Sequence, residues 1–439
     1  MANWQDYYKE HLLTMDEATK KINSGDNIWL GQTTGISYNF LNKLYERKDE
    51  LQNVGIFYNF STAMFDMLFD ETVKGHFKIM SVFTGPLDRM SGQMGIAEYN
   101  SNAYEHIVKG VCDVYKANTM VVEVCPPDEN GYCNTTILGA PTNCLINKHP
   151  GIIKRIAIVN KGQFPAQGDY EMLNIPVTTF DYFVEDDHEL SYLPVSPPTE
   201  VDKTIAGYIM PYIKEGDTVQ IGMGGLGEQI TQELYQKKNI SIYTEITVDS
   251  MVPLVEQGIV THVTTAGAYG SPKVYQFLGT SDKVTTKDMN HMLDPVVIGQ
   301  QDNLVAINST FMVDLLGQAC SEAQGPKQYS SVGGSFGYLY GATRSKGGRS
   351  FLCLRSTYKD EEGIRRSNIV AWLPEKSIVT TPKYLQMYIV SEYGVADVYL
   401  KTNKDRIKAL LKIAHPDFLE SLKKQIIAVG HITEEDFAE

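Results

Sequence analysis

Short apolar runs alternate with amphipathic stretches along the first half of the chain. Residues 14–17 have the Thr-x-x-Glu spacing of a capping box, which predicts a helix start. Strand candidates follow at 27–30, 54–58, 77–83, 120–125, 155–159 and 177–180, with a helical stretch at 101–111 among them. This alternation predicts βαβ units and an α/β fold in which a mostly parallel sheet is covered on both faces.

The second half of the chain repeats this organisation. Strand candidates lie at 218–222, 240–243, 260–264, 304–307, 350–354, 369–373 and 388–391. Near the end, Ile407, Leu410 and Leu411 have helical spacing, and Pro416 is placed to open another helix.

An internal repeat relates the two halves. Residues 22–31 and 213–222 share Ile, Gly, Asp and Gly at the same positions, and both segments run into Gly-rich sequence. An acidic, Pro-rich stretch at 185–200 lies before the second copy and is typical of a linker. We therefore expect two related, open α/β domains at 1–190 and 191–439, with an active site in the cleft where their strand ends meet.

Composition narrows the class of protein. The chain has 439 residues, a 43% hydrophobic fraction and a formal charge of −14. This charge argues against nucleic acid or an anionic membrane as the main partner, although a local basic pocket for a phosphorylated molecule stays compatible with it. No apolar run has the length of a membrane span and no targeting segment is evident, so we expect a cytoplasmic protein.

The cysteines and histidines give no sign of a metal or disulfide framework. The six cysteines are scattered without a Cys-x-x-Cys pair, and the nine histidines have no metal-binding spacing. We expect reduced thiols that are mostly buried.

A lone acid at a predicted strand end is the first candidate for chemistry. Residues 241–250 form a β-branched and aromatic run in which Glu245 is followed by turn-prone residues, as when a buried strand delivers one carboxylate to the rim of a sheet. A Gly-rich strand end at 221–227 lies about 20 residues upstream. We hypothesise that Glu245 is a nucleophile and that Gly-rich loops position a thioester against it.

Two Gly-rich stretches are candidates for ligand binding. Residues 222–227 follow a strand and precede a helix predicted at 228–236, so their N–H groups could approach an anion or a carbonyl oxygen; an ordinary tight turn is the alternative. The stretch at 330–341 leads into the basic residues 342–349. It is either a flexible surface loop or a phosphate or CoA pocket that uses Arg344, Lys346, Arg349 and Lys359. Glu392, at another strand end, is a second candidate carboxylate.

Several segments together resemble a known family. They include Tyr243-Thr-Glu-Ile246, Val332-Gly-Gly334, Ser391-Glu-Tyr-Gly394 and Ile413-Ala-His-Pro-Asp-Phe418. Their order and spacing resemble the class I CoA-transferases of the acetyl-CoA hydrolase/transferase family over nearly the whole chain. The resemblance implies transfer of CoA from a short-chain acyl-CoA, such as butyryl-, propionyl- or 4-hydroxybutyryl-CoA, to a carboxylate such as acetate.

The resemblance also implies roles for individual residues. Glu245 would form a glutamyl-CoA thioester, and Glu392 would be a cleft acid that helps order the site. From the basic stretch, Arg344 and Lys346 are also expected to support the cleft. CoA would be bound as a co-substrate by Gln220, Ile221, Gly222, Met223, Gly224, Gly225, Gly333, Gly334 and Lys359. The resemblance implies no metal and no tightly bound cofactor, and it favours a homodimer or higher homo-oligomer.

The chain departs from the family pattern beside its second glycine pair. Ser335 and Gly337 stand where the family often has Gln and Asp, which leaves open the acyl group and the balance of transfer against hydrolysis. An acyl-CoA hydrolase of the same fold and a non-catalytic metabolite-binding module are the alternatives. For the transfer chemistry we expect Glu245 to be ionised at neutral pH, because the reference pKa of a glutamate is about 4.3.

Overall fold

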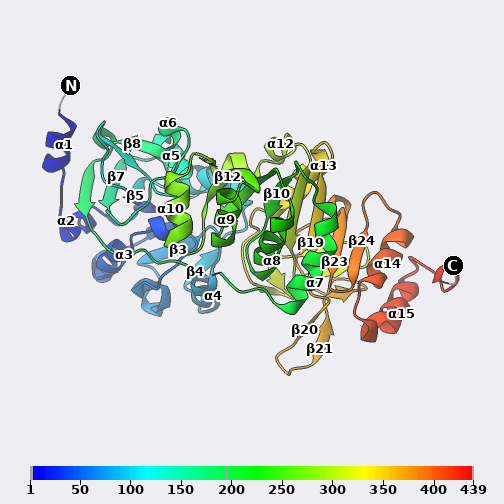
Figure 1. The fold of residues 1–439 in the computed structure, drawn as a ribbon. Coiled ribbons are helices and arrows are strands. Elements are labelled where there is room, and N and C mark those ends of the chain that lie inside the picture. Colours follow the sequence, from blue (N-terminus) through cyan, green and yellow to red (C-terminus); the bar gives the residue numbers. More distant parts are fainter. Residues whose placement is uncertain (1–2, 194, 438–439) are drawn as a thin grey trace. The chain divides into compact units, whose positions relative to one another are not determined.

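The computed structural model describes residues 3–193 and 195–437, which fold into two compact units (Figure 1). Unit 1 comprises the chain up to residue 193 together with 245–249 and 264–292, and unit 2 comprises 195–244, 250–263 and 293–437. The first segment ends close to the predicted boundary at 190. The structure nevertheless assigns two segments of the predicted second domain, one of which begins with Glu245, to unit 1.

Unit 1 is built on a parallel seven-stranded sheet. Its strand order is β4 (Ala97–Tyr99), β3 (Phe77–Ser81), β2 (Val54–Asn59), β1 (Asn27–Gln32), β5 (Thr119–Val124), β7 (Lys154–Val159) and β9 (Tyr182–Glu185). A short antiparallel pair joins β6 (Tyr132–Asn134) to β8 (Asn174–Pro176). The helices are α1 (Trp4–Glu10), α2 (Met15–Thr19), α3 (Tyr38–Tyr45), α4 (Pro86–Gln93), α5 (Ala140–Lys148), α6 (Tyr170–Leu173) and α10 (Pro272–Thr280).

The second sheet has eight strands and is parallel in its centre. Its order is β13 (Val284–Thr286), β12 (Val260–Ala268), β11 (Ile240–Thr247), β10 (Thr218–Ile221), β14 (Leu304–Ser309), β19 (Arg349–Cys353), β23 (Tyr388–Ser391) and β24 (Gly394–Asp397). The strand β24 runs antiparallel to its neighbour β23. The strands β11 and β12 begin in unit 2 and end in unit 1.

Helices and small hairpins complete unit 2. The helices are α7 (Glu200–Ile209), α8 (Gly225–Glu233), α9 (Val252–Glu256), α12 (Pro295–Ile298), α13 (Ser335–Arg344), α14 (Asn403–Lys412) and α15 (Leu419–Val429), and α11 (Met289–Leu293) ends here. The hairpins and short strands are β15 (Met312–Asp314), β16 (Ala319–Cys320), β17 (Ala323–Gln324), β18 (Lys327–Gln328), β20 (Thr357–Lys359), β21 (Arg365–Ser367) and β22 (Ile369–Val370).

The two large sheets share one strand order, as the repeated segment predicts. The order β4-β3-β2-β1-β5-β7-β9 of the first sheet corresponds to β13-β12-β11-β10-β14-β19-β23 of the second. The repeat places β1 and β10 at equivalent positions, and each lies between the strand that follows it in the chain and a later one. The predicted α/β class with mostly parallel sheets is therefore confirmed.

Each unit buries its own hydrophobic core. In unit 1 the core includes Ile28, Ile56, Val121 and Ile156 from adjacent strands, with Phe40 packed from α3. In unit 2 strand residues such as Leu352 and Ile389 pack against Ile407, Leu410 and Leu411 of α14, the residues whose spacing predicts that helix. Burying each of these side chains contributes about 1.5–3 kcal/mol, so these faces determine where the helices dock.

Four local predictions differ from the structure. Residues 177–179 form a 3-10 turn, and the strand lies at β9. Of residues 369–373, only Ile369–Val370 pair, with β15. The helix predicted at 101–111 is a 3-10 turn followed by a π-helical segment at Lys109–Val114. The Gly-rich stretch at 330–341 is not a loop throughout, because α13 begins at Ser335.

The capping box and the cysteines agree with their predictions. Thr14 and Glu17 exchange side-chain and backbone hydrogen bonds at the start of α2. All six thiols are buried, and burial raises the pKa of the Cys125 thiol to about 12. Across the part of the chain that the structure describes, no helix combines the length and apolar character that crossing a membrane requires.

Candidate active site

Glu245 lies near the end of β11, where the chain passes from unit 2 into unit 1. The hydroxyl of Thr244 donates to the Ile221 carbonyl at 2.9 Å, which fixes the residue before Glu245 to the strand that leads into Gly222. On the other side, Thr265 Oγ1 donates to the Glu245 carbonyl at 3.2 Å. The backbone on both sides of the candidate nucleophile is therefore held by hydroxyls of β11 and β12.

Glu245 is partly exposed as a residue, but its carboxyl is poorly solvated. Burial raises its pKa to about 7, and the nearby negative charge of Glu105 adds to this effect. The expectation of full ionisation at neutral pH is therefore wrong, because about half of the Glu245 side chains are protonated at pH 7. The ionised form is correspondingly more basic than an ordinary carboxylate, which suits a nucleophile.

Two buried tyrosines of unit 1 lie within electrostatic range of Glu245. Burial raises the pKa of Tyr104 and of Tyr269 well above the ordinary value, and the charge of Glu245 contributes to both shifts. Neither tyrosine was singled out in the sequence, and neither was Glu105. All three lie in irregular segments or just past a strand end, where sequence periodicity gives no signal.

Two features of the structure explain glycines in the segment 222–227. Gly224 adopts a φ of 107° at the start of α8, a conformation that favours glycine. Gly227, one turn into α8, has no room for a side chain, because a Cβ there would lie 2.1 Å from the Gly222 carbonyl oxygen. Close packing of α8 on the strand end therefore explains part of the Gly-rich pattern. It also leaves N–H groups at the N-terminus of α8 available for a ligand.

The side chains around this loop differ in accessibility. Gln220 is buried and forms an amide pair with Asn308, whose Nδ2 donates to Gln220 Oε1 at 2.8 Å. Ile221 is buried as well, whereas Met223 is 46% exposed. Of the predicted CoA-binding residues here, Gln220 and Ile221 can offer a ligand mainly their backbone, and Met223 its side chain.

Gly333 and Gly334 immediately precede α13. Gly333 has a φ of 71°, and the helix returns the chain to the start of β19, so the glycine pair lies toward the carboxyl edge of the parallel sheet. Gly337 has a packing reason: a Cβ there would lie 2.3 Å from the Leu293 carbonyl oxygen. An aspartate at position 337 could not fit this backbone, which accounts for one departure from the family pattern.

The structure does not bring the basic stretch together with the Gly-rich loop. Arg344 and Lys346 are exposed and precede β19, so they lie at the amino-terminal edge of the sheet, whereas Gly222 follows β10 at the carboxyl edge. The four residues of β10 span about 13 Å. Arg349 is ion-paired with the buried carboxylate of Asp217.

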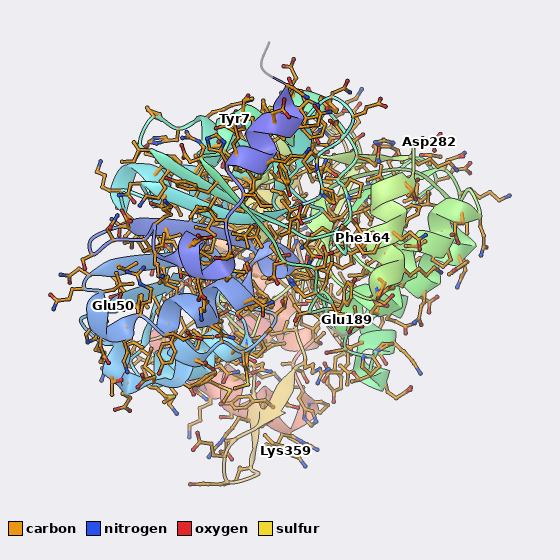
Figure 2. The ribbon with its side chains drawn as sticks, turned by 90° about the vertical axis from the view of Figure 1, so that its left-hand side faces the viewer. Tyr7, Glu50, Phe164, Glu189, Asp282 and Lys359 are labelled. Atoms are coloured by element: carbon orange, nitrogen blue, oxygen red, sulfur yellow. The ribbon has the colours of Figure 1, made fainter. Side chains whose placement is uncertain are left out.

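Glu392 and the segment that leads to Lys359 do lie together. Ser356 donates to the two Glu392 oxygens through its backbone N–H at 2.9 Å and through its hydroxyl at 2.5 Å. Both residues follow the ends of neighbouring parallel strands, β23 and β19. Lys359 is exposed on the β20–β21 hairpin (Figure 2). Glu392 therefore holds the base of the segment on which Lys359 is carried.

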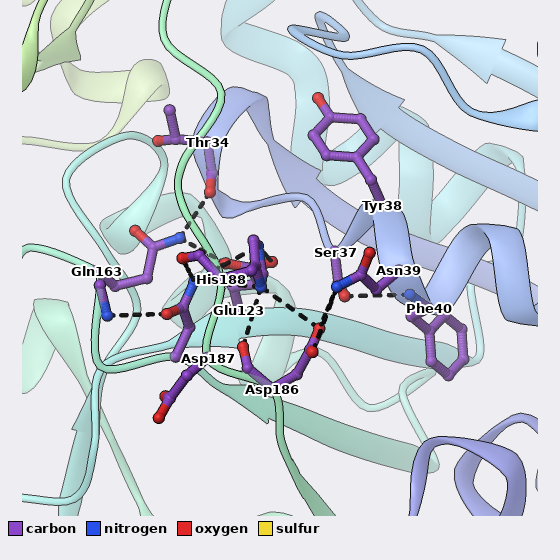
Figure 3. A network of polar contacts seen from close by, with 12 residues as sticks. Thr34, Ser37, Tyr38, Asn39, Phe40, Glu123, Gln163, Asp186, Asp187 and His188 are labelled. Atoms are coloured by element: carbon purple, nitrogen blue, oxygen red, sulfur yellow. Dashed lines mark hydrogen bonds and ion pairs between the residues drawn. The ribbon is translucent and has the colours of Figure 1, made fainter.

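Unit 1 also contains a buried carboxylate that the sequence did not point to. Glu123 of β5 is fully buried, and its Oε1 lies 3.0 Å from Nε2 of His188 (Figure 3). Gln163 donates to the other Glu123 oxygen and to the Thr34 carbonyl, each at 2.6 Å. Hydrogen bonding to Glu123 raises the pKa of His188 to about 9. This network fixes the segment after β9, predicted as a linker, to the sheet.

Comparison with known proteins places the chain in a class. A model of the acetyl-CoA hydrolase/transferase C-terminal domain matches residues 270–426. The chain is 31% identical to the succinyl-CoA:cyclohexane-1-carboxylate CoA transferase of Geobacter metallireducens over 95% of each chain. It is 30% identical to the 4-hydroxybutyrate coenzyme A transferase of Clostridium kluyveri over 96% of this chain and 98% of that one.

A solved structure has the same fold. RipA from Yersinia pestis has a TM-score of 0.89 at 25% identity, with 98% of this chain and 100% of RipA covered. Fold and sequence together define a CoA-transferase. The chain belongs to the acetyl-CoA hydrolase/transferase family, as its motifs predict.

Proposed function

We propose that this protein transfers CoA from a short-chain acyl-CoA to a carboxylate such as acetate, through a thioester on Glu245. Butyryl-, propionyl- and 4-hydroxybutyryl-CoA are the candidate donors, and CoA acts as a co-substrate. The observation that carries the proposal is Glu245 itself, a partly exposed residue with a fixed backbone and a carboxyl whose pKa is raised to about 7. The activities of the two relatives named above, both CoA transferases, support it.

The reaction begins with the ionised form of Glu245. A Glu245 oxygen attacks the thioester carbonyl of the acyl-CoA, the C–S bond breaks, and CoA leaves as a thiolate. The product is a mixed anhydride between Glu245 and the acyl group. The thiolate then attacks the Glu245 carbonyl carbon, the C–O bond to the acyl group breaks, and the first carboxylate departs. Glu245 is left as its CoA thioester.

The second half of the reaction reverses these steps with another carboxylate. The acceptor attacks the Glu245 thioester carbonyl, CoA thiolate leaves, and the thiolate then attacks the acceptor's carbonyl in the new anhydride. A new acyl-CoA and the free Glu245 carboxylate result. Protons and electrons balance without an oxidant or a metal, because each step exchanges one acyl bond for another.

Negative charge develops on a carbonyl oxygen at every attack. Backbone N–H groups of the two glycine segments, Gly222–Gly225 and Gly333–Gly334, are the donors proposed to stabilise it. A donor of this kind contributes about 3–4 kcal/mol to the transition state. Lys359 is proposed to contact CoA, and Glu392 to order the segment that carries it, as its two hydrogen bonds with Ser356 indicate.

The proposal is tested by the dependence of CoA release on an acceptor. The purified protein is given butyryl-CoA with and without acetate, and acetyl-CoA and free CoA are measured separately. Transfer predicts acetyl-CoA formation that requires acetate and little free CoA in its absence. Release of CoA at the same rate without acetate would instead establish the acyl-CoA hydrolase that the family description also includes.

A variant of the nucleophile makes this test specific. Glu245→Gln keeps the shape of the side chain but cannot form the anhydride, so acetyl-CoA formation should fall by at least about a thousandfold. Glu392→Gln serves as the comparison, because this acid is assigned only a positioning role and should retain part of the activity. The cytoplasmic location and the homo-oligomeric assembly expected from the sequence stay predictions.

A further inference from the structure

A closed cluster of polar side chains lies in unit 1, outside every residue assigned above to CoA binding. Asn59 Nδ2 donates to Gln32 Oε1 at 2.7 Å and to the hydroxyl of Tyr104, and this hydroxyl lies 3.2 Å from the same Gln32 oxygen. Gln32 and Asn59 are paired at the ends of β1 and β2. All three side chains are buried. We call Gln32, Asn59 and Tyr104 the amide cluster.

The amide cluster has one donor and one acceptor left over. Gln32 Nε2 and Asn59 Oδ1 are buried and have no hydrogen-bond partner in the described part of the chain. Flipping both amides, which exchanges their N and O atoms, also leaves two groups unpaired. Gln32 Nε2 would then donate to Asn59 Oδ1, and the Asn59 NH2 and the Gln32 carbonyl would have no partner. Unpaired buried polar groups are costly, and here a donor and an acceptor lie on two neighbouring side chains, so one ligand group could satisfy both.

Backbone packing holds Gln32 in this position. Gly139, with a φ of 91°, lies against the amide, and a Cβ at that residue would be 2.5 Å from Gln32 Nε2. The donor is thus confined by main chain on one side and by Asn59 on the other. A polar group fixed in this way favours a ligand atom at one place over a general affinity for water.

A row of aromatic rings runs from Tyr104 of the amide cluster to Tyr269. Ring centroids are 5.9 Å apart for Tyr104 and Phe83, 6.0 Å for Phe83 and Phe60, and 5.3 Å for Phe60 and Tyr269. The two tyrosines at the ends of this row are those whose pKa the charge of Glu245 helps to raise. The row therefore places apolar rings beside the amide cluster, and the amide cluster offers hydrogen bonds at one end of it.

We propose that the amide cluster is a subsite for a hydroxyl group on the acyl chain transferred at Glu245, so that hydroxyacyl groups are preferred over plain alkyl groups. The proposal rests on the proposed function of Glu245. A hydroxyl accepts a hydrogen bond from one amide and donates one to the other, which pairs both left-over groups. An alkyl chain can form a hydrogen bond with neither Gln32 Nε2 nor Asn59 Oδ1. A second carboxylate could only accept, and it would meet the negative charges of Glu245 and Glu105.

The test compares acceptors that differ only in the hydroxyl. With acetyl-CoA as donor, kcat/KM is measured for butyrate and for 2-, 3- and 4-hydroxybutyrate. We expect at least one hydroxybutyrate to exceed butyrate by about tenfold or more, because a site built to bind a hydroxyl discriminates strongly against the analogue that lacks it. The position of the preferred hydroxyl reports its distance from Glu245. Equal values for all four acceptors in the wild-type protein would overturn the proposal.

Variants connect the preference to the two amides. In the double variant Gln32→Met, Asn59→Leu, the ratio of hydroxybutyrate to butyrate should fall to within about twofold of one. Asn143→Leu is the matched control, since Asn143 is a buried amide of the same unit whose Oδ1 accepts from Trp29 Nε1 at 2.9 Å. It should lower stability and leave the ratio unchanged. An equal loss of the preference in this control would overturn the subsite.

Failure of the subsite can be told apart from failure of the proposed function. Formation of the Glu245 thioester from butyryl-CoA is measured by mass spectrometry in the same wild-type protein. If the thioester forms and no hydroxyl preference is seen, only the subsite is overturned. If no acyl-CoA gives a thioester, the assignment of Glu245 is overturned and the subsite with it. The comparison in the wild-type protein stays decisive even if the double variant does not fold.

Discussion

Asn59 and Glu245 occupy equivalent positions in the two sheets of this protein. In the first sheet Asn27 of β1 pairs with Gly55, and Asn59 lies four residues further along β2. In the second sheet Thr218, the counterpart of Asn27 in the repeat, pairs with Ser241, and Glu245 lies four residues further along β11. The two copies of one strand end thus carry an amide and a carboxylate, the first proposed to recognise substrate and the second to react with it.

The first prediction concerns the pH dependence of transfer. Because the carboxylate form of Glu245 attacks and its pKa is raised to about 7, kcat/KM should increase with pH through an inflection near 7 and level off above about pH 8. Below the inflection it should fall about tenfold per pH unit. Initial rates with butyryl-CoA and acetate between about pH 5 and 9 check this. A flat profile over that range would mean that Glu245 keeps an ordinary pKa.

The second prediction concerns the stability that the Glu123–His188 contact provides. The pKa of His188 is raised to about 9 in the folded protein, against about 6.5 when unfolded. The stability that protonated His188 contributes to the folded protein is therefore fully present below about pH 6.5 and is lost as the pH rises through about 9. His188→Gln should lower the free energy of unfolding by up to about 3 kcal/mol more at pH 6 than at pH 10, as measured by urea denaturation.

His149→Gln is the control for this experiment. His149 is similarly exposed, at 24% against 23% for His188, but its partner Asp113 is an exposed carboxylate and not a buried one. A surface pair of this kind contributes at most about 1 kcal/mol. If His188→Gln cost the same at both pH values, the stabilising charge on His188 would be disproved.

The third prediction separates two lysines. Lys359→Ala should raise the KM for acyl-CoA by about tenfold, since a charge-assisted hydrogen bond to a phosphate contributes about 1.5–3 kcal/mol. Lys346→Ala should leave this KM within about twofold of the wild-type value, because Lys346 lies at the amino-terminal edge of the sheet. Both residues are exposed, so their replacement should not unfold the protein. If Lys346→Ala raised this KM more than Lys359→Ala does, the basic stretch and not the hairpin would be the CoA site.

The fourth prediction concerns the glycine that departs from the family pattern. Gly337→Ala places a Cβ 2.3 Å from the Leu293 carbonyl oxygen, so it should lower the free energy of unfolding by about 2 kcal/mol or more. Gly207→Ala is the matched control in another helix, α7, where a Cβ would meet no atom within 4 Å. That change should stabilise by about 0.5–1 kcal/mol. Thermal unfolding of the two variants distinguishes packing from helix propensity.

The strands could be predicted from sequence better than the segments between them. Buried strands such as β2 are continuous apolar runs, and the repeat at 22–31 and 213–222 indicated the shared strand order. The stretch at 330–341 was harder, because its glycines suggested a loop. Gly337 and Gly341 are in fact where α13 packs closely on its neighbours, and such a contact is a tertiary property that a local pattern does not report.

The candidate site was predicted in part. Glu245 stood out as a lone acid in a strand, and Glu392 as an acid at a strand end. The position of the basic stretch at 342–349 could not be predicted, because the sequence does not show at which edge of a sheet a charge lies. Gln32, Asn59 and Tyr104 were missed, although the repeat contained a signal for one of them, since it makes Asn59 the counterpart of Glu245.

The central claim is tested most directly by trapping the intermediate. The protein is incubated with butyryl-CoA without an acceptor, reduced with borohydride and digested, and the peptide that contains Glu245 is analysed by mass spectrometry. The account predicts that this glutamate alone is converted to the corresponding alcohol, and that Glu245→Gln shows no such product. An unmodified Glu245 peptide from protein that turns over fully, or reduction at a different glutamate, would contradict it.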